Sequence, residues 1–234
     1  VFAAATEDSR PVLTGIKVEL EEDRFTLAAA DGFRLAVHHG RLLESIGEPA
    51  NVIIPARTLG EVHRLLGEQE EPIEVTVTPQ KSQALFRLKN VEIVSQLIQG
   101  TFPNYAQLIP QSYTTRAIID LQEFQRATRT AAIFARDGSG IIRLQMFPGG
   151  EKAGKVTVSA SAEEVGDNHG EIDAKIEGDE AKIAINSKYL IELLAAIDKP
   201  AVVLEATTPS SPGVLRPVGS DNYIHVVMPM FVQW

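Results

Sequence analysis

Two stretches of the sequence, NVIIPARTLGEVHRLLG at residues 51–67 and KIAINSKYLIELLAAI at residues 182–197, share one plan. Each begins with a short apolar run of the kind found in buried strands, and each continues with apolar residues at the spacing of one helix face. Pro55 at the first turn of the first helix, and Asn186 or Ser187 as the cap of the second, indicate where the helices start. The sequence thus predicts a strand leading into a helix twice, with apolar stripes made by Leu59, Val62, Leu65 and Leu66 and by Leu190, Ile191, Leu193, Leu194 and Ile197.

The segments around these two stretches repeat as well. In both copies the predicted order is a helix, strands, a strand leading into a helix, and further strands. From Asp8 to Pro55 the chain advances 47 residues, and from Asp137 to Asn186 it advances 49. Such a shared spacing of landmarks indicates a duplicated unit.

Strand and helix patterns elsewhere agree with this plan. Ile73, Val75 and Val77 alternate with polar residues, as in a half-buried strand, and residues 154–162 alternate in the same way. Asp120 begins a D-x-x-E helix start that is followed by an apolar stripe. The members of that stripe are Leu121, Phe124, Ala127 and Ala131, with Glu123 as the fourth residue of the start.

The chain length of 234 residues exceeds the usual size of one domain. We expect an α+β fold of two similar domains, each with two helices packed on antiparallel sheets. The domains are predicted at residues 1–114 and 115–234, with the boundary near residues 113–116, where turn residues separate the copies. Residues 1–10 resemble the end of a helix and no initiator Met precedes them, so we expect a fragment whose N-terminal part is missing.

Composition excludes several classes of site. The chain has no cysteine, which rules out disulfides, thiol nucleophiles and cysteine zinc sites and fits a reducing cytoplasm. No apolar run approaches the roughly 18 residues of a membrane-spanning helix. A net charge of −9 argues against a nucleic-acid binder that works through overall positive charge, but it permits basic residues gathered on one face.

Basic residues do recur on the predicted helices. Arg57 and Arg64 are seven residues apart on one helix, Arg126 and Arg129 are three apart on another, and Lys188 opens a third. These side chains form either an ordinary solvated face or a shared basic surface that faces a polyanion. The pattern alone leaves both interpretations open.

An enzyme is the natural competing class. His38 and His39 lie next to each other on a predicted strand and therefore point to opposite faces. Asp31 and Arg34 follow no glycine-rich phosphate loop, so we expect them to form a turn and a rim. We expect no catalytic site, no metal and no cofactor. A third class, a repeat-built interaction protein without DNA, also fits the two α+β repeats.

Three further stretches carry a resemblance to a known family: AADGFRLAV at residues 29–37, QGTFPNYAQLIP at 99–110 and VVMPMF at 226–231. In this order and spacing they resemble the bacterial DNA polymerase III beta subunits, the replicative sliding clamps, and the resemblance covers the whole chain. It implies the second and third of three similar clamp domains. It also implies a non-enzymatic, cytoplasmic and nucleoid-associated processivity factor, whose full-length form is a head-to-tail homodimeric ring around duplex DNA.

In such a ring, the basic helices face the DNA, and contacts with phosphates carry no sequence information. The resemblance therefore favours the polyanion interpretation for the basic residues. The other implied partners are the polymerase catalytic subunit, the clamp loader and repair proteins, which dock through short linear motifs. The DNA-facing candidates are Arg57, Arg64, Arg126, Arg129 and Lys188.

The resemblance also implies a peptide-binding pocket between the two domains. The methionines supply adaptable surface, the prolines stiffen the walls, and Gly32 lets a peptide or a neighbouring strand approach closely. Arg34 is expected to cover the rim with its stem and keep its charge in water, and one of Val226 and Val227 to face the core and the other the pocket. The residues are Leu13, Ala30, Gly32, Phe33, Arg34, Leu35, Pro103, Gln107, Leu108, Pro212, Val226, Val227, Met228, Pro229, Met230, Phe231 and Val232.

The sequence departs from the family's pattern at several pocket positions. Phe33 stands where many clamps have a polar residue, Gln107 stands at a position that is often Arg, and Phe231 replaces a usual basic residue. The tail also continues through Gln233 and Trp234, beyond the common end. These differences predict a more apolar pocket with its own peptide preference.

The family's second protein interface is the head-to-tail contact of the ring. Ile133 and Phe134 match the apolar pair that meets the first domain of the next protomer, although both also fit as core residues at the end of a helix. If they form the interface, the chain exposes an apolar patch, and without the complementary domain we expect a monomer.

Overall fold

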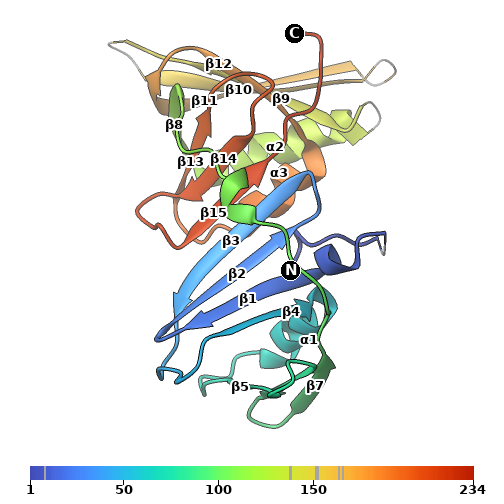
Figure 1. The fold of residues 1–234 in the computed structure, drawn as a ribbon. Coiled ribbons are helices and arrows are strands. Elements are labelled where there is room, and N and C mark those ends of the chain that lie inside the picture. Colours follow the sequence, from blue (N-terminus) through green and yellow to red (C-terminus); the bar gives the residue numbers. More distant parts are fainter. Residues whose placement is uncertain (8, 137–138, 151–152, 163, 165) are drawn as a thin grey trace. The chain divides into compact units, whose positions relative to one another are not determined.

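The computed structural model describes residues 1–7, 9–136, 139–150, 153–162, 164 and 166–234, and it forms two compact units (Figure 1). The N-terminal unit comprises Val1–Tyr105 and the C-terminal unit comprises Ala106–Trp234. Asp8 and Asp137, the first landmarks of the predicted repeat spacing, lie outside the described residues. No helix in the described part of the chain has both the length and the apolar character needed to cross a membrane.

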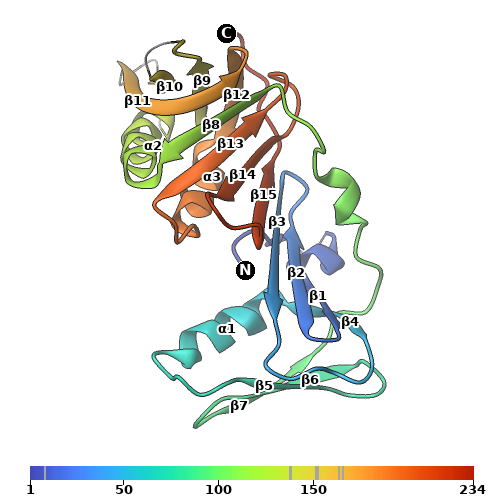
Figure 2. The same cartoon turned by 90° about the vertical axis from the view of Figure 1, so that its left-hand side faces the viewer.

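The N-terminal unit is built on two antiparallel sheets. The larger sheet has the strand order β3-β2-β1-β4 and the smaller one the order β5-β6-β7. Its elements are η1 (Pro11–Thr14), β1 (Gly15–Glu21), β2 (Arg24–Ala30), β3 (Arg34–Arg41), β4 (Ala50–Pro55), α1 (Ala56–Leu66), β5 (Glu74–Val77), β6 (Gln83–Arg87) and β7 (Glu92–Gln96). The helix and the smaller sheet together cover one face of the larger sheet (Figure 2). The core between them contains Ile16, Val18, Val52, Ile54, Val62 and Phe86.

The C-terminal unit has one antiparallel sheet in the order β12-β9-β10-β11-β8-β13-β14-β15. Its elements after η2 (Tyr105–Leu108) are β8 (Thr115–Asp120), α2 (Leu121–Arg136), β9 (Ile141–Phe147), β10 (Gly154–Ala162), β11 (Gly166–Gly178), β12 (Ala181–Asn186), α3 (Ser187–Ala195), β13 (Ala201–Ala206), β14 (Gly213–Pro217) and β15 (Tyr223–Val227). Helices α2 and α3 pack side by side, and Nε2 of Gln125 donates a 2.8 Å hydrogen bond to the carbonyl of Leu194. Phe124, Leu190, Leu193 and Leu194 are fully buried beneath them.

The two stretches that decide the fold behave as predicted. Strand β4 runs directly into α1, and β12 runs directly into α3. Oδ1 of Asn186 accepts hydrogen bonds from the backbone N–H groups of Lys188 at 2.9 Å and Tyr189 at 3.4 Å, so Asn186 and not Ser187 is the cap. Asp120 caps α2 in the same way, accepting from the N–H of Glu123 at 2.9 Å. Pro55 occupies the N-cap position and the helix starts one residue later.

The fold class is therefore confirmed, with two differences in the N-terminal unit. Its described residues contain one α-helix, where the sequence predicted two, and the first residues form turns such as that closed by Ala4 N–H to the carbonyl of Val1 at 3.1 Å. A single turn fixes several residues for one hydrogen bond, and such nucleation is unfavourable. Strand β5 exists, but Val75 is exposed, since only Ile73 and Val77 pack on the core.

Candidate functional site

The D-G-F-R-L motif forms the turn between β2 and β3. Oδ1 of Asp31 accepts from the backbone N–H groups of Phe33 at 2.9 Å and Arg34 at 3.0 Å, and Oδ2 accepts from Nε of Arg34 at 2.9 Å. Gly32 has φ = +96°, a backbone conformation that residues with a Cβ rarely adopt. The motif is thus a side-chain-stabilised turn, as the sequence predicted.

One detail of this turn differs from the expectations. Arg34 is 7% exposed, and its Nη2 donates a 2.5 Å hydrogen bond to the carbonyl of Phe2. The prediction that its charge stays in water is wrong, because Asp31 supplies a buried partner for the guanidinium. Gly32 is closely approached by the guanidinium of Arg10, which a Cβ would meet at 2.8 Å, and the approach of a peptide to Gly32 stays a prediction.

The F-P-x-Y motif fastens the end of the N-terminal unit onto β1. Phe102 is buried, and the hydroxyl of Tyr105 donates a 2.6 Å hydrogen bond to Oε2 of Glu19. Nζ of Lys17 lies 2.8 Å from Oε1 of Glu19 and 5.1 Å from the centroid of the Tyr105 ring. The backbone N–H of Ile98 donates to the carbonyl of Ile53 on β4 at 2.9 Å, so the segment is held at both ends.

Charge and burial shift two pKa values in this cluster. Burial raises the pKa of Glu19, but the hydrogen bonds from Lys17 and Tyr105 and the charge of Lys17 outweigh it, so the net pKa lies below the ordinary value. Burial raises the pKa of the Tyr105 hydroxyl, and the hydrogen bond to the Glu19 carboxylate raises it further. The cluster therefore holds an ionised carboxylate and a neutral phenol at neutral pH.

The predicted pocket residues divide into buried and exposed groups. Leu13, Ala30 and Leu35 are buried in the N-terminal unit. Val226 and Val227 of β15 are both buried, and which of the two faces a pocket stays a prediction. All five residues are buried and therefore contribute little exposed area.

Apolar surface is offered by other members of the predicted set. Phe33 in the N-terminal unit is 58% exposed, and Leu108, Met228 and Phe231 in the C-terminal unit are 53%, 44% and 91% exposed. Large apolar side chains held in water are informative when they fall within the three stretches that carry the family resemblance. Pro103 and Gln107 are exposed too, whereas Pro212, Pro229, Met230 and Val232 are partly exposed.

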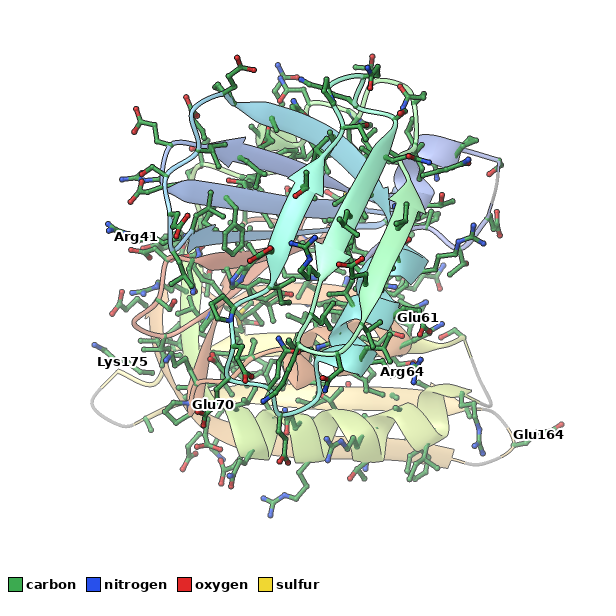
Figure 3. All side chains as sticks on the ribbon, turned by 90° about the horizontal axis from the view of Figure 1, so that it is seen from below. Arg41, Glu61, Arg64, Glu70, Glu164 and Lys175 are labelled. Atoms are coloured by element: carbon green, nitrogen blue, oxygen red, sulfur yellow. The ribbon has the colours of Figure 1, made fainter. Side chains whose placement is uncertain are left out.

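All five basic candidates are exposed on helices. Arg57 and Arg64 lie on α1, Arg126 and Arg129 on α2, and Lys188 on α3. Nε and Nη2 of Arg64 bind Oε2 of Glu61 at 2.9 and 2.7 Å, and Figure 3 shows the two side chains next to each other. Lys188 lies 4.0 Å from Glu192. The charges of these two residues are therefore partly compensated.

The other three arginines carry uncompensated charge. Arg57, Arg126 and Arg129 take part in no ion pair within the described residues. On the C-terminal unit, α2 and α3 pack side by side, so the two arginines of α2 and Lys188 of α3 belong to neighbouring helices. Such an arrangement suits contact with a polyanion.

The predicted apolar pair lies near the end of α2. Ile133 is 56% exposed, so the alternative that it is a core residue is wrong, whereas Phe134 is partly buried. Residues 166–174 of β11 pair with β10, and residues 174–178 pair with β8 on the other edge. In the part of the chain that the structure describes, the first half of β11 therefore has an open edge, which is a site where another strand can add.

The histidine pair points to opposite faces of β3. Nδ1 of His39 lies 2.9 Å from Oγ1 of Thr26, while the ring of His38 lies 6.2 Å from that of Phe25. Within the described residues no group of three or more histidine, aspartate or glutamate side chains is placed to hold a metal ion. Sequence patterns did not reveal Arg10, Lys17, Glu19 or the contacts of Trp234, because each depends on pairing between distant segments.

Comparison with known proteins identifies the family. The profile of the DNA polymerase III beta subunit central domain matches residues 1–104, and that of its C-terminal domain matches residues 106–231. The chain belongs to the DNA polymerase III beta subunit family. Members of this family are non-catalytic polymerase subunits, the bacterial sliding clamps. The resemblance stated from sequence and the fold class are thereby confirmed.

Individual clamps are similar over nearly the whole chain. The beta sliding clamp of Staphylococcus aureus (strain Mu50) is 35% identical over 231 residues, which is 98% of this chain and 59% of that protein. The sliding clamp structure from Bacillus subtilis has a TM-score of 0.92 at 29% identity, covering 99% of this chain and 60% of the other. A Pseudomonas aeruginosa clamp bound to griselimycin has a TM-score of 0.88 at 25% identity, with 99% and 61% covered. The chain thus spans about three fifths of the length of these relatives.

Proposed function

We propose that this chain is the second and third domains of a sliding clamp that acts as a non-enzymatic processivity factor. The observation that carries the proposal is the pair of profile matches, central domain followed by C-terminal domain, over residues 1–104 and 106–231. The domain limits 1–114 and 115–234 remain a prediction, as does a cytoplasmic, nucleoid-associated location. The full-length protein tethers a replicative polymerase, a clamp loader and repair proteins to DNA.

The DNA part of the proposal rests on the helices. Exposed arginines on α1 and α2 that have no ion-pair partner among the described residues suit sequence-independent contact with phosphates, and the acidic balance of the chain then belongs to other surfaces. In the full-length head-to-tail dimer, helices of this kind line the ring. Arg57, Arg126 and Arg129 carry the contact, while Arg64 and Lys188 contribute less because Glu61 and Glu192 are close to them.

A salt series tests this assignment. We expect weak binding of the chain to short DNA duplexes of unrelated sequences at low salt, equal for all of them and falling steeply as salt rises. Changing Arg57, Arg126 and Arg129 together to Glu removes the binding. The matched control changes three exposed basic residues of strands to Glu, namely Arg24, Arg41 and Lys175. This control should leave the DNA affinity within twofold of the native value. Equal loss in both variants assigns the contact to general charge and defeats the proposal.

The peptide part rests on exposed apolar residues carried by both units. Phe33, Leu108, Met228 and Phe231 offer surface for aliphatic and aromatic anchors, while Leu13, Leu35, Val226 and Val227 are buried. We propose that short linear motifs of partner proteins dock at a pocket made by these residues of the second and third domains. An extended peptide in an apolar groove is a common mode of recognition.

The ring interface is proposed at the exposed Ile133 and at Phe134 of α2, together with the open edge of β11, a strand that α2 contacts. Backbone pairing at an open edge and an apolar contact next to it are suited to a head-to-tail joint. The partner surface belongs to a domain outside this chain, so we expect a monomer. Light scattering checks this: a monomer mass is the expected result, and a stable dimer of the chain contradicts the interface assignment.

A further inference from the structure

The C-terminal tail of the chain follows the outer edge of β12. The backbone N–H of Met230 donates a 2.8 Å hydrogen bond to the carbonyl of Ala184. Four residues later, the ring of Trp234 lies over Nζ of Lys182, with 5.5 Å from the nitrogen to the ring centroid. The tail advances from 230 to 234 while its contacts retreat from 184 to 182, so it runs antiparallel to β12. Both views place the chain end beside this strand (Figures 1 and 2).

One edge of β12 is suited to receive this tail. The opposite edge of β12 pairs with β9 over residues 181–186. In an antiparallel strand the N–H and C=O groups of one residue point to the same side, and alternate residues share that side. Because the carbonyl of Ala184 points to the tail, the backbone groups of Lys182 point there as well. The tail therefore covers an edge that exposed backbone groups would otherwise leave open to other chains.

Between these two contacts stands the most exposed apolar side chain of the described residues. Phe231 is 91% exposed, whereas Trp234 is 43% exposed. Chain ends fray unless they are tied down, and the tail is tied on both sides of Phe231, by the Met230 hydrogen bond and by the Lys182–Trp234 contact. The Phe231 ring therefore keeps nearly all of its apolar surface free for a bound partner.

We propose that Lys182 and Trp234 are positioning residues, which anchor the tail so that Met228, Met230 and Phe231 are preorganised for the linear peptides of partner proteins. This inference rests on the proposed peptide site. A cation over a tryptophan ring is attracted by the face of the ring, and tryptophan is the best aromatic partner for it. Anchoring lowers the ordering cost that the peptide would otherwise meet on binding.

The anchor itself is measured without any peptide. Trp234 is the single tryptophan of the chain, so its fluorescence reports the tail alone. We expect Lys182→Met to raise the quenching of Trp234 by acrylamide and to lower its emission anisotropy, and Lys182→Arg to restore both, because arginine keeps the cation. Lys175→Met, an exposed lysine of β11, is the matched control and leaves both unchanged. Unchanged quenching in Lys182→Met overturns the anchor.

The positioning role is measured by fluorescence polarisation with a labelled Gln-Leu-Ala-Leu-Phe peptide. Trp234→Ala is expected to weaken binding roughly three- to fivefold, the scale of one exposed cation–π contact, and Trp234→Phe to recover part of it. Thermal unfolding stays unchanged in both variants. Equal affinity of Trp234→Ala and the native chain overturns the positioning role, even when the anchor is present. If the native chain binds no peptide but Lys182→Met still changes the quenching of Trp234, then the proposed peptide site is wrong and the anchor is retained.

Discussion

The hydroxyl of Tyr105 donates a 2.6 Å hydrogen bond to the carboxylate of Glu19, 86 residues earlier in the chain. Lys17 lies against both, at 2.8 Å from the carboxylate and 5.1 Å from the ring centroid. This contact explains why an F-P-x-Y motif ends the N-terminal unit: Phe102 fills the core, and Tyr105 fixes the chain to β1 just before the C-terminal unit begins.

Removing the Tyr105 hydroxyl is expected to destabilise the N-terminal unit. Tyr105→Phe should lower the free energy of unfolding by about 1 kcal/mol, less than a fully buried bond to a charged group, because the Glu19 side chain is partly exposed. Urea unfolding gives the value. Tyr113→Phe is the control, since the Tyr113 hydroxyl makes no hydrogen bond within the described residues and the change should have no effect. Equal stability of the two variants would contradict the role of the bond.

Glu19 should also make stability depend on pH. Its pKa in the folded chain lies below the ordinary value, so the carboxylate contributes stability above about pH 4.3, the pKa of an unperturbed Glu. That contribution is lost as the pH falls through the lowered pKa. The gap in unfolding free energy between the native chain and Glu19→Gln should therefore be present at neutral pH and shrink in acid. Glu21→Gln, at an exposed site on the same strand, should show no such gap, and a gap independent of pH would argue against an ionic role.

The caps of α2 and α3 should contribute measurably, because they satisfy N–H groups that have no partner inside a helix. Asn186→Ala is expected to cost about 1 kcal/mol of unfolding free energy, since the N–H groups of Lys188 and Tyr189 lose their acceptor. Asn186→Asp keeps an acceptor oxygen and should retain most of the stability. Chemical denaturation of both variants decides this, and identical losses would mean that the hydrogen bonds of the cap are unimportant.

Gly32 is expected to tolerate no side chain without cost. Gly32→Ala requires an alanine at φ = +96° and places its Cβ 2.8 Å from Arg10, so we expect a loss of about 1 kcal/mol or more. Gly47→Ala is the control, because nothing lies within 4 Å of a Cβ there. Combining Gly32→Ala with Arg10→Ala separates the clash from the backbone strain: recovery of stability indicates the clash, and no recovery indicates the strain.

Local chemistry made much of the fold predictable. The strand-to-helix stretches, the cap at Asp120 and the alternation of residues 154–162 depend on neighbours a few residues apart, and the structure contains all of them. The missing first helix of the N-terminal unit and the exposed Val75 were not predictable in this way. They depend on what lies against a segment, which periodicity does not record.

Sequence motifs indicated which residues belong to the candidate site, but they did not indicate which of those side chains are buried. Motifs pointed to Asp31, Arg34 and the valines of β15, but partners elsewhere in the chain decide that Arg34 is buried and that both valines are covered. The Lys182–Trp234 contact had no signal in the sequence, because a single aromatic residue at a chain end is compatible with any position.

Binding of a partner-like peptide is the most direct test of the whole interpretation. Labelled Gln-Leu-Ala-Leu-Phe is titrated with the chain and with Leu108→Asp/Met228→Asp, whose sites are exposed, so that the change alters the surface and not the core. The control is Leu43→Asp/Val94→Asp, which adds the same charges at exposed apolar residues outside the proposed pocket. We predict saturable binding to the native chain and to the control, and at least tenfold weaker binding to the pocket variant, a difference of about 1.4 kcal/mol. No binding to the folded native chain, or equal loss in both variants, would contradict the proposed peptide-binding pocket.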